Sequence, residues 1–195
     1  MKAVFLDRDG VINELIYYQE QGIVDSPFTA EQFRLLPGVG EAIRKLNEAD
    51  YKVILASNQP GIAKGSMSEE NFQKIRQKMT QELAEAGAFL DGEYYCFHHP
   101  EAKVERLRAN CGCRKPEPGL LLQAAKDMGI DLSKSWMIGD GLTDVKAGKR
   151  AGTRTILRGG MKCELCHLMD EEDARPDAIS PNLEEAVQFI LTQGG

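Results

Sequence analysis

The sequence predicts an α/β fold in which helices cover both faces of a parallel sheet. Short apolar runs, three of which are followed directly by Asp7, Ser57 or Gly139, alternate with longer segments in which apolar residues recur at helical spacing. Strands that alternate with helices form parallel sheets through right-handed crossovers, which place helices on both faces. No internal repeat or linker interrupts the pattern, so we expect one domain spanning residues 1–195.

The apolar runs and the helical spacing locate the expected elements. Strands are predicted at residues 3–6, 51–56, 93–97, 135–138 and 153–157. Helices are predicted after Pro37-Gly38, after Ser68 as N-cap, from Gly119, over Thr143–Ala151, and from Asn182, which forms a capping-box pattern with Glu185. Residues 11–36 are expected to form a long functional loop, and residues 163–181 an irregular acidic segment.

Composition excludes several classes of protein. With 195 residues, 42% of them hydrophobic, the chain is long and apolar enough for a full core, which excludes a disordered protein. Its formal net charge of -6 argues against a nucleic-acid partner. No apolar run has membrane-spanning length and the N-terminus lacks a signal-peptide pattern. We therefore expect a cytoplasmic protein without membrane contact, and a monomer because no interface pattern stands out.

Two carboxylates mark the end of the first predicted strand. Asp7 and Asp9 follow the run Ala3-Val4-Phe5-Leu6, and Gly10 permits a sharp turn. Ligands of open parallel sheets bind beyond the carboxyl ends of the strands, and two acids there favour a divalent cation such as magnesium. Acidic residues are also common in plain turns, so the pair becomes informative only if other groups converge on it.

Other reactive side chains occupy equivalent positions along the chain. Ser57 and Asp140 each follow a predicted strand, and Lys115 precedes a predicted helix. In a parallel sheet all of them would meet Asp7 and Asp9 at one edge. Three carboxylates can hold magnesium, while a hydroxyl and an ammonium can bind phosphate oxygens. One carboxylate would then be free to act as a nucleophile and another to transfer a proton.

These motifs resemble those of the haloacid dehalogenase (HAD) superfamily of phosphatases. The matching segments are Asp7-Arg8-Asp9-Gly10, Ser57-Asn58-Gln59, Lys115 and Gly139-Asp140 with Asp144. The resemblance implies that Asp7 attacks phosphorus and that Asp9 is the general acid and base. It also implies that Ser57 and Lys115 stabilise the phosphoryl group. Magnesium would be held by Asp7, Asp9 through its backbone carbonyl, and Asp140, with Asp144 in a supporting position.

Three of the five cysteines, together with a histidine, form a pattern typical of zinc. Cys96-x-His98 and Cys111-x-Cys113 supply four ligands in two close pairs, which suits a closed structural site in a loop at about residues 96–113. His99 is an alternative fourth ligand, although the spacing and the family resemblance favour His98. A bound zinc would fix the direction of Arg114 and Lys115, which follow directly. The alternative is a set of free thiols.

Within the superfamily, the chain resembles the D-glycero-D-manno-heptose 1,7-bisphosphate phosphatases. The resemblance lies in residues 57–65, 94–100 and 111–119. It implies removal of the C7 phosphate in ADP- or GDP-heptose biosynthesis, for lipopolysaccharide or surface glycans, by a protein without a large cap domain. The residues implied to bind substrate are Leu15, Ile16, Tyr17, Tyr18, Asn58, Gln59, Pro60 and Arg114. Two positions depart from the family pattern: Gly141 replaces a common lysine and Pro60 a common serine.

Two alternatives to the heptose substrate remain, and one motif has no assignment. A histidinol-phosphate phosphatase or another small-molecule phosphatase could share these motifs, including the zinc loop. A zinc-dependent binding or scaffold protein is the non-enzymatic alternative, although no catalytic acid is missing here. Cys163-x-x-Cys166-His167 has no counterpart in the family pattern. It could be a second metal site or a redox pair, and two ordinary cysteines are the simplest interpretation.

Overall fold

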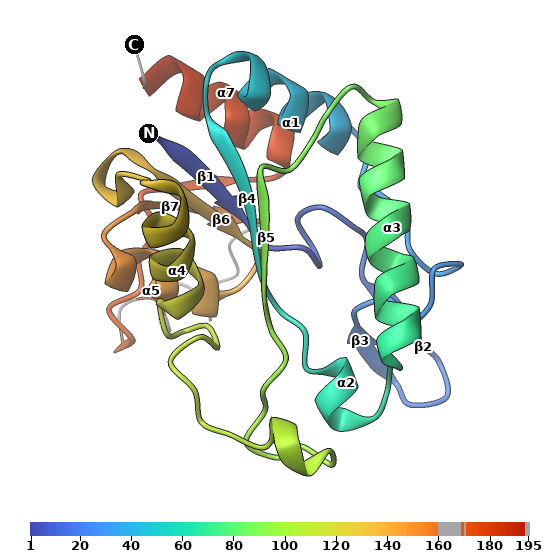
Figure 1. Ribbon diagram of the computed structural model, residues 1–195. Coiled ribbons are helices and arrows are strands. Elements are labelled where there is room, and N and C mark those ends of the chain that lie inside the picture. Colours follow the sequence, from blue (N-terminus) through green and yellow to red (C-terminus); the bar gives the residue numbers. More distant parts are fainter. Residues whose placement is uncertain (160–168, 170, 194–195) are drawn as a thin grey trace.

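Six strands form one parallel sheet at the centre of the molecule (Figure 1). The computed structural model describes residues 1–159, 169 and 171–193. In spatial order the strands are β5 (Gly92–Cys96), β4 (Lys52–Asn58), β1 (Ala3–Leu6), β6 (Trp136–Gly139), β7 (Arg154–Arg158) and β8 (Ala178–Ser180). Every pair of neighbours is parallel, which confirms the predicted α/β class.

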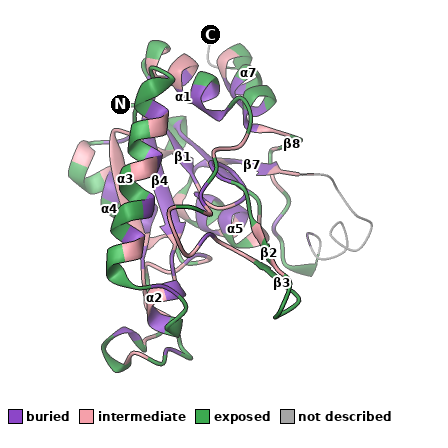
Figure 2. Ribbon diagram, turned by 90° about the vertical axis from the view of Figure 1, so that its right-hand side faces the viewer, coloured by how far each residue is buried: buried purple, intermediate pink, exposed green. Residues whose placement is uncertain are grey.

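Helices cover both faces of this sheet because its strands are apolar on both sides. Val4 and Leu6 of β1 point into a core cluster that includes apolar residues of α1 (Val39–Glu48), α3 (Glu69–Glu85) and α7 (Leu183–Gln193). Ala3 and Phe5 point the other way, into a cluster with α4 (Gly119–Met128). Next to α4, α5 (Leu142–Ala151) packs on β6 and β7. The central strands are buried throughout, as Figure 2 shows.

Two predicted helix starts have the expected caps. Ser68 Oγ accepts a hydrogen bond from Asn71 N at 3.0 Å, which satisfies one free N–H in the first turn of α3. At α7, Glu185 N donates to Asn182 Oδ1 at 2.8 Å, and Asn182 Nδ2 donates to Glu185 Oε1 at 3.1 Å. The first bond is the N-cap half of the capping box that the sequence predicted. In the second, Glu185 accepts from the Asn182 side chain and not from the Asn182 backbone N–H, so the other half of the box is replaced by a side-chain contact.

Two segments predicted to be irregular contain regular structure. The loop after β1 includes a small antiparallel hairpin, β2 (Ile16–Tyr18) and β3 (Ile23–Asp25), whose turn contains Gly22 at φ 65. Residues 163–181 were expected to be irregular, yet Ala178–Ser180 form the edge strand β8, which pairs with β7. Both strands of the hairpin and β8 are only three residues long, too short for a clear alternation of apolar and polar side chains.

Short segments, rather than a cap domain, lie beyond the carboxyl edge of the sheet. Figure 1 shows α2 (Gly61–Lys64) and the loop after β5, with the 3-10 turn η1 (Glu105–Leu107), extending from this edge. A second 3-10 turn, η2 (Leu132–Lys134), precedes β6. In the described residues, no segment inserted at this edge is large enough to form a cap domain. None of the described helices combines the length and the apolar character needed to span a membrane.

Candidate active site

The predicted catalytic residues meet at the carboxyl end of β1. This strand lies between β4 and β6, and the chain builds the sheet outwards from it first on one side and then on the other. In such sheets the crevice beside the strand where the order reverses is the usual ligand site. Asp7 and Asp9 follow β1, Ser57 lies near the end of β4, and Asp140 follows β6. The predicted convergence at one edge is therefore present in the structure.

Lys115 is the central cation of the site. It is 2% exposed, and its Nζ lies 3.0 Å from Asp7 Oδ1 and 2.5 Å from Asp144 Oδ1. The same atom donates to the backbone carbonyl of Ala56 at 2.8 Å. Burial disfavours the charged form, but the adjacent Asp144 and Asp7 carboxylates outweigh it and raise the pKa of Lys115. The lysine therefore stays charged while it touches the expected nucleophile.

Asn58 fixes the backbone that carries Lys115. Its Nδ2 donates to Lys115 O at 3.0 Å and its Oδ1 accepts from Lys115 N at 3.0 Å. This reciprocal pair joins the end of β4 to the loop after the cysteine cluster, and both polar atoms of the Asn58 amide take part. The Asn58 amide therefore orients Lys115. The family resemblance implies that Asn58 binds substrate and does not predict this contact with the Lys115 backbone.

Three carboxylates form the group best suited to a divalent cation. Asp7, Asp140 and Asp144 each place an oxygen within 4.8 Å of the others. Crowding by protein atoms and repulsion from Asp7 and Asp144 raise the pKa of Asp140 to about 7, although its side chain still reaches solvent. Gly10 makes room for the group, since a Cβ there would lie 2.2 Å from Asp140 Oδ2. Hard oxygen ligands with excess negative charge suit magnesium.

Asp144 differs from the other two acids because both of its oxygens are engaged. Oδ1 pairs with Lys115, and Oδ2 accepts a hydrogen bond from Gly141 N at 3.1 Å. The residue is 1% exposed, and its burial raises the pKa of the carboxyl group despite the nearby lysine. Asp144 therefore holds Lys115 and the Gly141 turn in place, which leaves Asp7 and Asp140 with the freer oxygens.

The Asp9 carboxylate does not belong to this group of acids. It accepts hydrogen bonds from Arg8, Asn13 and Gln59, which agrees with the expectation that Asp9 would bind a metal through its backbone carbonyl. Gln59 Nε2 also donates to Ser57 Oγ at 3.0 Å, which links the proposed acid to the proposed phosphate ligand. Sequence reasoning missed Arg8 and Asn13, because an arginine between two acids in a turn gives no indication of burial.

The remaining substrate-binding candidates lie on the β2–β3 hairpin, at the start of α2 and in the loop before Lys115. Leu15 precedes β2 and residues 16–18 form it, on a hairpin that extends from the main body (Figure 2). Tyr17 is 61% exposed, whereas Tyr18 stacks on Phe28 and donates to Ser26 O. Pro60 is the N-cap of α2, and Arg114 donates from Nη1 to His98 O at 3.3 Å.

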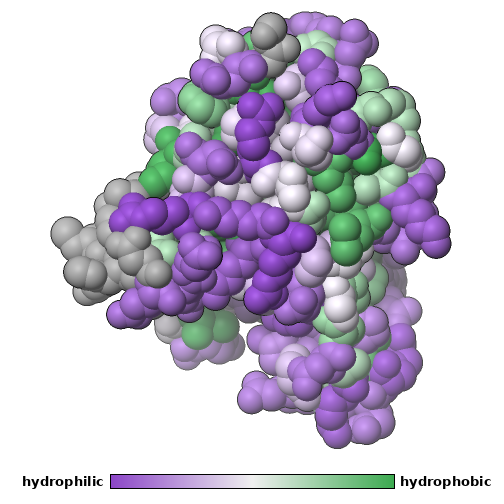
Figure 3. Space-filling view, turned by 90° about the vertical axis from the view of Figure 1, so that its left-hand side faces the viewer, coloured by the Kyte–Doolittle hydropathy of each residue, from purple (hydrophilic) through white to green (hydrophobic). Residues whose placement is uncertain are grey.

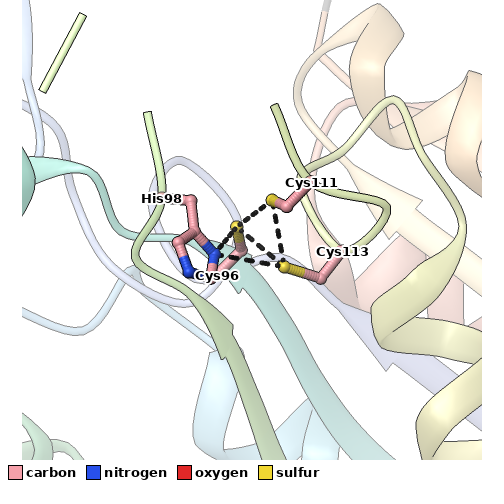
Figure 4. A group of neighbouring side chains, drawn as sticks. All are labelled: Cys96, His98, Cys111 and Cys113. Atoms are coloured by element: carbon pink, nitrogen blue, oxygen red, sulfur yellow. Dashed lines mark hydrogen bonds between the residues drawn. The ribbon is translucent and has the colours of Figure 1, made fainter. Parts of the chain in front are cut away.

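Cys96, His98, Cys111 and Cys113 form a compact cluster (Figure 4). Their sulfur atoms are 3.2 to 3.5 Å apart, and His98 Nδ1 lies 3.6 Å from Cys113 Sγ and 3.9 Å from Cys96 Sγ. The His99 ring instead accepts a hydrogen bond from Glu101 N, so His98 is the histidine brought to the cluster. A set of three sulfurs and one imidazole nitrogen suits tetrahedral zinc. The motif Cys163-x-x-Cys166-His167 lies outside the described residues.

Comparison with known proteins identifies phosphatases that are similar to this chain. Residues 112–186 match a family model described as HAD-hydrolase-like. The D-glycero-beta-D-manno-heptose-1,7-bisphosphate 7-phosphatase of Photorhabdus laumondii is 43% identical over 162 residues, 81% of each chain. The protein of that name from Escherichia coli K12 is 40% identical over 193 residues, 97% of this chain and 87% of the relative.

Solved structures show the same similarity over the whole chain. The D,D-heptose 1,7-bisphosphate phosphatase from B. bronchiseptica, solved with magnesium and phosphate, has a TM-score of 0.80 and 29% identity and covers 99% of both chains. The corresponding phosphatase from Burkholderia thailandensis has a TM-score of 0.68 and 25% identity. The chain thus shares its fold with these phosphatases and is 40% identical to one of them over 97% of its length. Together with the motifs at the carboxyl edge, this shows that the chain belongs to the heptose-bisphosphate phosphatase family of HAD-like hydrolases.

Proposed function

We propose that this protein hydrolyses the C7 phosphate of D-glycero-β-D-manno-heptose 1,7-bisphosphate in ADP- or GDP-heptose biosynthesis. The observation that carries the proposal is the pairing of Asp7 with the buried Lys115, beside Asp140, at the carboxyl end of the central strand. The names and the near full-length coverage of the curated relatives support the heptose substrate and its β anomer. Gly141 and Pro60 are the positions at which this chain departs from the usual family residues.

In the first chemical step, Asp7 attacks the C7 phosphorus. A bond forms between a carboxylate oxygen of Asp7 and phosphorus while the bond from phosphorus to the C7 oxygen breaks. Asp9 gives its proton to that oxygen, so heptose 1-phosphate leaves as an alcohol. In the second step Asp9 takes a proton from water, and the water oxygen displaces Asp7 from phosphorus. Free phosphate leaves and both aspartates return to their starting forms.

The charges around Asp7 make the attack of an anion on an anion possible. Lys115 contacts the attacking carboxylate and would meet the equatorial phosphate oxygens, where negative charge spreads in the transition state. The Ser57 hydroxyl would bind the same oxygens. Magnesium, held by Asp7, Asp140 and the backbone carbonyl of Asp9, would neutralise charge on the transferring group.

A side-by-side substrate comparison tests this assignment. We expect the highest kcat/KM for the β-anomer of heptose 1,7-bisphosphate, measured with the α-anomer, histidinol phosphate and p-nitrophenyl phosphate, because a built substrate site discriminates through transition-state binding. A higher kcat/KM for histidinol phosphate would assign the chain to the alternative phosphatase. Hydrolysis of none of the four would favour a zinc-dependent binding protein instead.

We also propose that the cysteine cluster binds structural zinc. Cys113 directly precedes Arg114 and Lys115, and Gly119 N donates to Gly112 O at 2.9 Å, which ties the loop to the start of α4. A zinc held by all four ligands would therefore fix the direction from which Lys115 enters the site. Its contribution is to stability and preorganisation, since four protein ligands leave no open position for substrate.

Elemental analysis tests the zinc site. Protein purified without chelators is expected to contain about one zinc per chain, because the described residues contain one four-ligand Cys/His cluster. Cys111→Ser should lower the zinc content and the melting temperature, whereas Cys163→Ser should change neither. Absence of zinc from the wild-type protein would contradict the assignment, and a second zinc ion that is lost in Cys163→Ser would indicate a further site at Cys163.

We further propose that the protein is a cytoplasmic monomer acting on a phosphorylated sugar without nucleic acid or membrane. Cys96, Cys111 and Cys113 form no disulfide although their sulfur atoms lie within 3.5 Å of one another, which fits zinc ligands in a reducing compartment. The face shown in Figure 3 is mostly hydrophilic, with one larger apolar area on its right-hand side and smaller apolar spots elsewhere. Light scattering during gel filtration would test the monomeric state.

A further inference from the structure

Arg8, between the two catalytic aspartates, is a buried cation at the site. Its side chain is 1% exposed, and it contacts Asp9 through three hydrogen bonds. Nε donates to Oδ1 at 3.3 Å, and Nη2 donates to Oδ1 and Oδ2, each at 3.1 Å. Burying a guanidinium is costly unless a carboxylate compensates it. Nη1 nevertheless has no hydrogen-bond partner within the described part of the chain, a cost that a purely apolar side chain would avoid.

Two buried amides complete the surroundings of the same carboxylate. Asn13 Nδ2 donates to Asp9 Oδ1 at 3.0 Å, and Gln59 Nε2 donates to Oδ2 at 2.6 Å. Asn13 is 0% and Gln59 1% exposed, while the Asp9 side chain is 15% exposed. The carboxylate is thus held from the protein side by three buried donors and keeps a small exposed edge, which is the part a leaving group can reach.

We propose that Arg8, Asn13 and Gln59 form a buried cradle that orients the Asp9 carboxylate for proton transfer, and that Arg8 is its principal positioning residue. The inference rests on the proposed phosphatase mechanism, in which Asp9 is the acid. Gln59 adds a link to the phosphate, because the nitrogen that binds Asp9 also binds Ser57 Oγ. One buried amide therefore fixes the position of Asp9, the proton donor, relative to Ser57, a proposed phosphate ligand.

Arg8 suits this role because its guanidinium is a rigid planar fork. Two nitrogens of the fork reach the carboxylate, which restrains both the position and the rotation of the Asp9 side chain. A proton donor must lie within hydrogen-bond reach of the oxygen that it protonates, and a shift of about 1 Å can cost roughly 10²-fold in rate. Loss of the fork should therefore impair protonation of the leaving oxygen more than the attack by Asp7.

Substrates with different leaving groups can distinguish a positioning role of Arg8 from a purely structural role. As the bond from phosphorus to oxygen breaks, a sugar or alkyl oxygen must receive the proton of Asp9, whereas p-nitrophenolate leaves unprotonated. The ratio kcat/KM reports only the steps up to transfer of phosphorus to Asp7, so the shared second step does not enter it. A cradle that positions the acid should matter for alkyl phosphates and little for the aryl phosphate, while general damage would slow both equally.

The experiment compares wild type, Asp9→Asn, Arg8→Met and Arg8→Lys on two substrates. These are p-nitrophenyl phosphate and whichever alkyl phosphate the wild type hydrolyses best. We expect Asp9→Asn to lower kcat/KM for the alkyl phosphate by about 10²- to 10⁴-fold. Arg8→Met should lower it by about 10- to 100-fold, with a loss of about threefold or less for the aryl phosphate. Arg8→Lys should recover part of the loss, since one ammonium cannot replace the planar fork.

Two further variants control for folding and for surface charge. Asn13→Leu removes a donor to Asp9 at similar volume and, unlike a change at Gln59, leaves the amide that holds Ser57 in place. It should show the same selective loss if Arg8→Met is too unstable to assay. Arg44→Met removes the exposed arginine that pairs with Glu48 and should leave both rates at the wild-type level. Equal losses on the two substrates in folded Arg8→Met and Asn13→Leu would overturn the proposed cradle. If Asp9→Asn itself showed no selectivity, the acid role of Asp9 would fail instead.

Discussion

Asp7→Asn is expected to abolish turnover while the protein stays folded. The variant replaces the proposed nucleophile with an amide of nearly the same shape, which cannot form an acyl phosphate by this route. Removing the nucleophile of a covalent mechanism typically costs several orders of magnitude, and we expect a fall in kcat of at least about 10⁴-fold. A discontinuous phosphate-release assay with the best substrate measures this loss.

A matched substitution separates chemistry from folding. Asp127→Asn changes an exposed carboxylate at the C-terminal end of α4, where it interacts with Gln123 and Tyr94, whereas Lys115 precedes the other end of this helix. This control should retain wild-type kcat. Circular dichroism should show native helix content in Asp7→Asn, because β1 itself remains apolar and buried. Wild-type turnover by Asp7→Asn would end the proposal that Asp7 is the nucleophile.

The placement of the catalytic residues could be predicted because it depends on topology. In a parallel sheet, residues that follow successive strands meet at one edge whatever the details of packing. Asp7, Ser57 and Asp140 met this condition, and the structure brings them together with Lys115. The cysteine cluster could be predicted for another reason. Two close Cys and His pairs, Cys96-x-His98 and Cys111-x-Cys113, match the ligand pattern of structural zinc sites.

The interactions that connect these residues could not be predicted in the same way. Arg8 lies between two acids, a sequence that suggests a solvated turn, yet tertiary packing buries it against Asp9. Asn58 follows Ser57 and resembles a substrate ligand, but its amide pairs with the backbone of Lys115, 57 residues away. Such contacts depend on side-chain direction and on long-range register, neither of which has a local pattern in the sequence.

Short elements were missed for a different reason. The strands β2, β3 and β8 have three residues each, fewer than a period-two pattern needs to be recognised. The hairpin also exposes Tyr17 and Val24, so burial does not select its apolar residues. These strands depend on pairing with a partner strand, β8 with the end of the main sheet at β7 and β2 with β3 in a local hairpin, rather than on their own propensity.

Lys115→Met is expected to damage catalysis and stability together. The substitution removes the only cation whose ion pair with Asp7 or Asp144 is seen among the described residues, and Asp144 is itself buried. Loss of one partner from a buried ion pair leaves an uncompensated charge and costs roughly 3 to 5 kcal/mol. Loss of one stabilising donor in the transition state lowers kcat by about 10²- to 10³-fold. Denaturant titration in buffer without added magnesium and without chelator measures the first effect, and steady-state rates in magnesium measure the second.

The double variant Lys115→Met with Asp144→Asn separates these two effects. Neutralising Asp144 removes the buried charge that Lys115 compensates, so the double variant should be more stable than Lys115→Met alone. Its kcat should stay low, because no ammonium then faces Asp7 and the phosphate. Recovery of stability without activity would show that Lys115 compensates Asp144 in the folded state and stabilises the phosphoryl group during the reaction. Recovery of activity as well would contradict a direct role for Lys115 in catalysis, and would make it a structural counter-ion of Asp144.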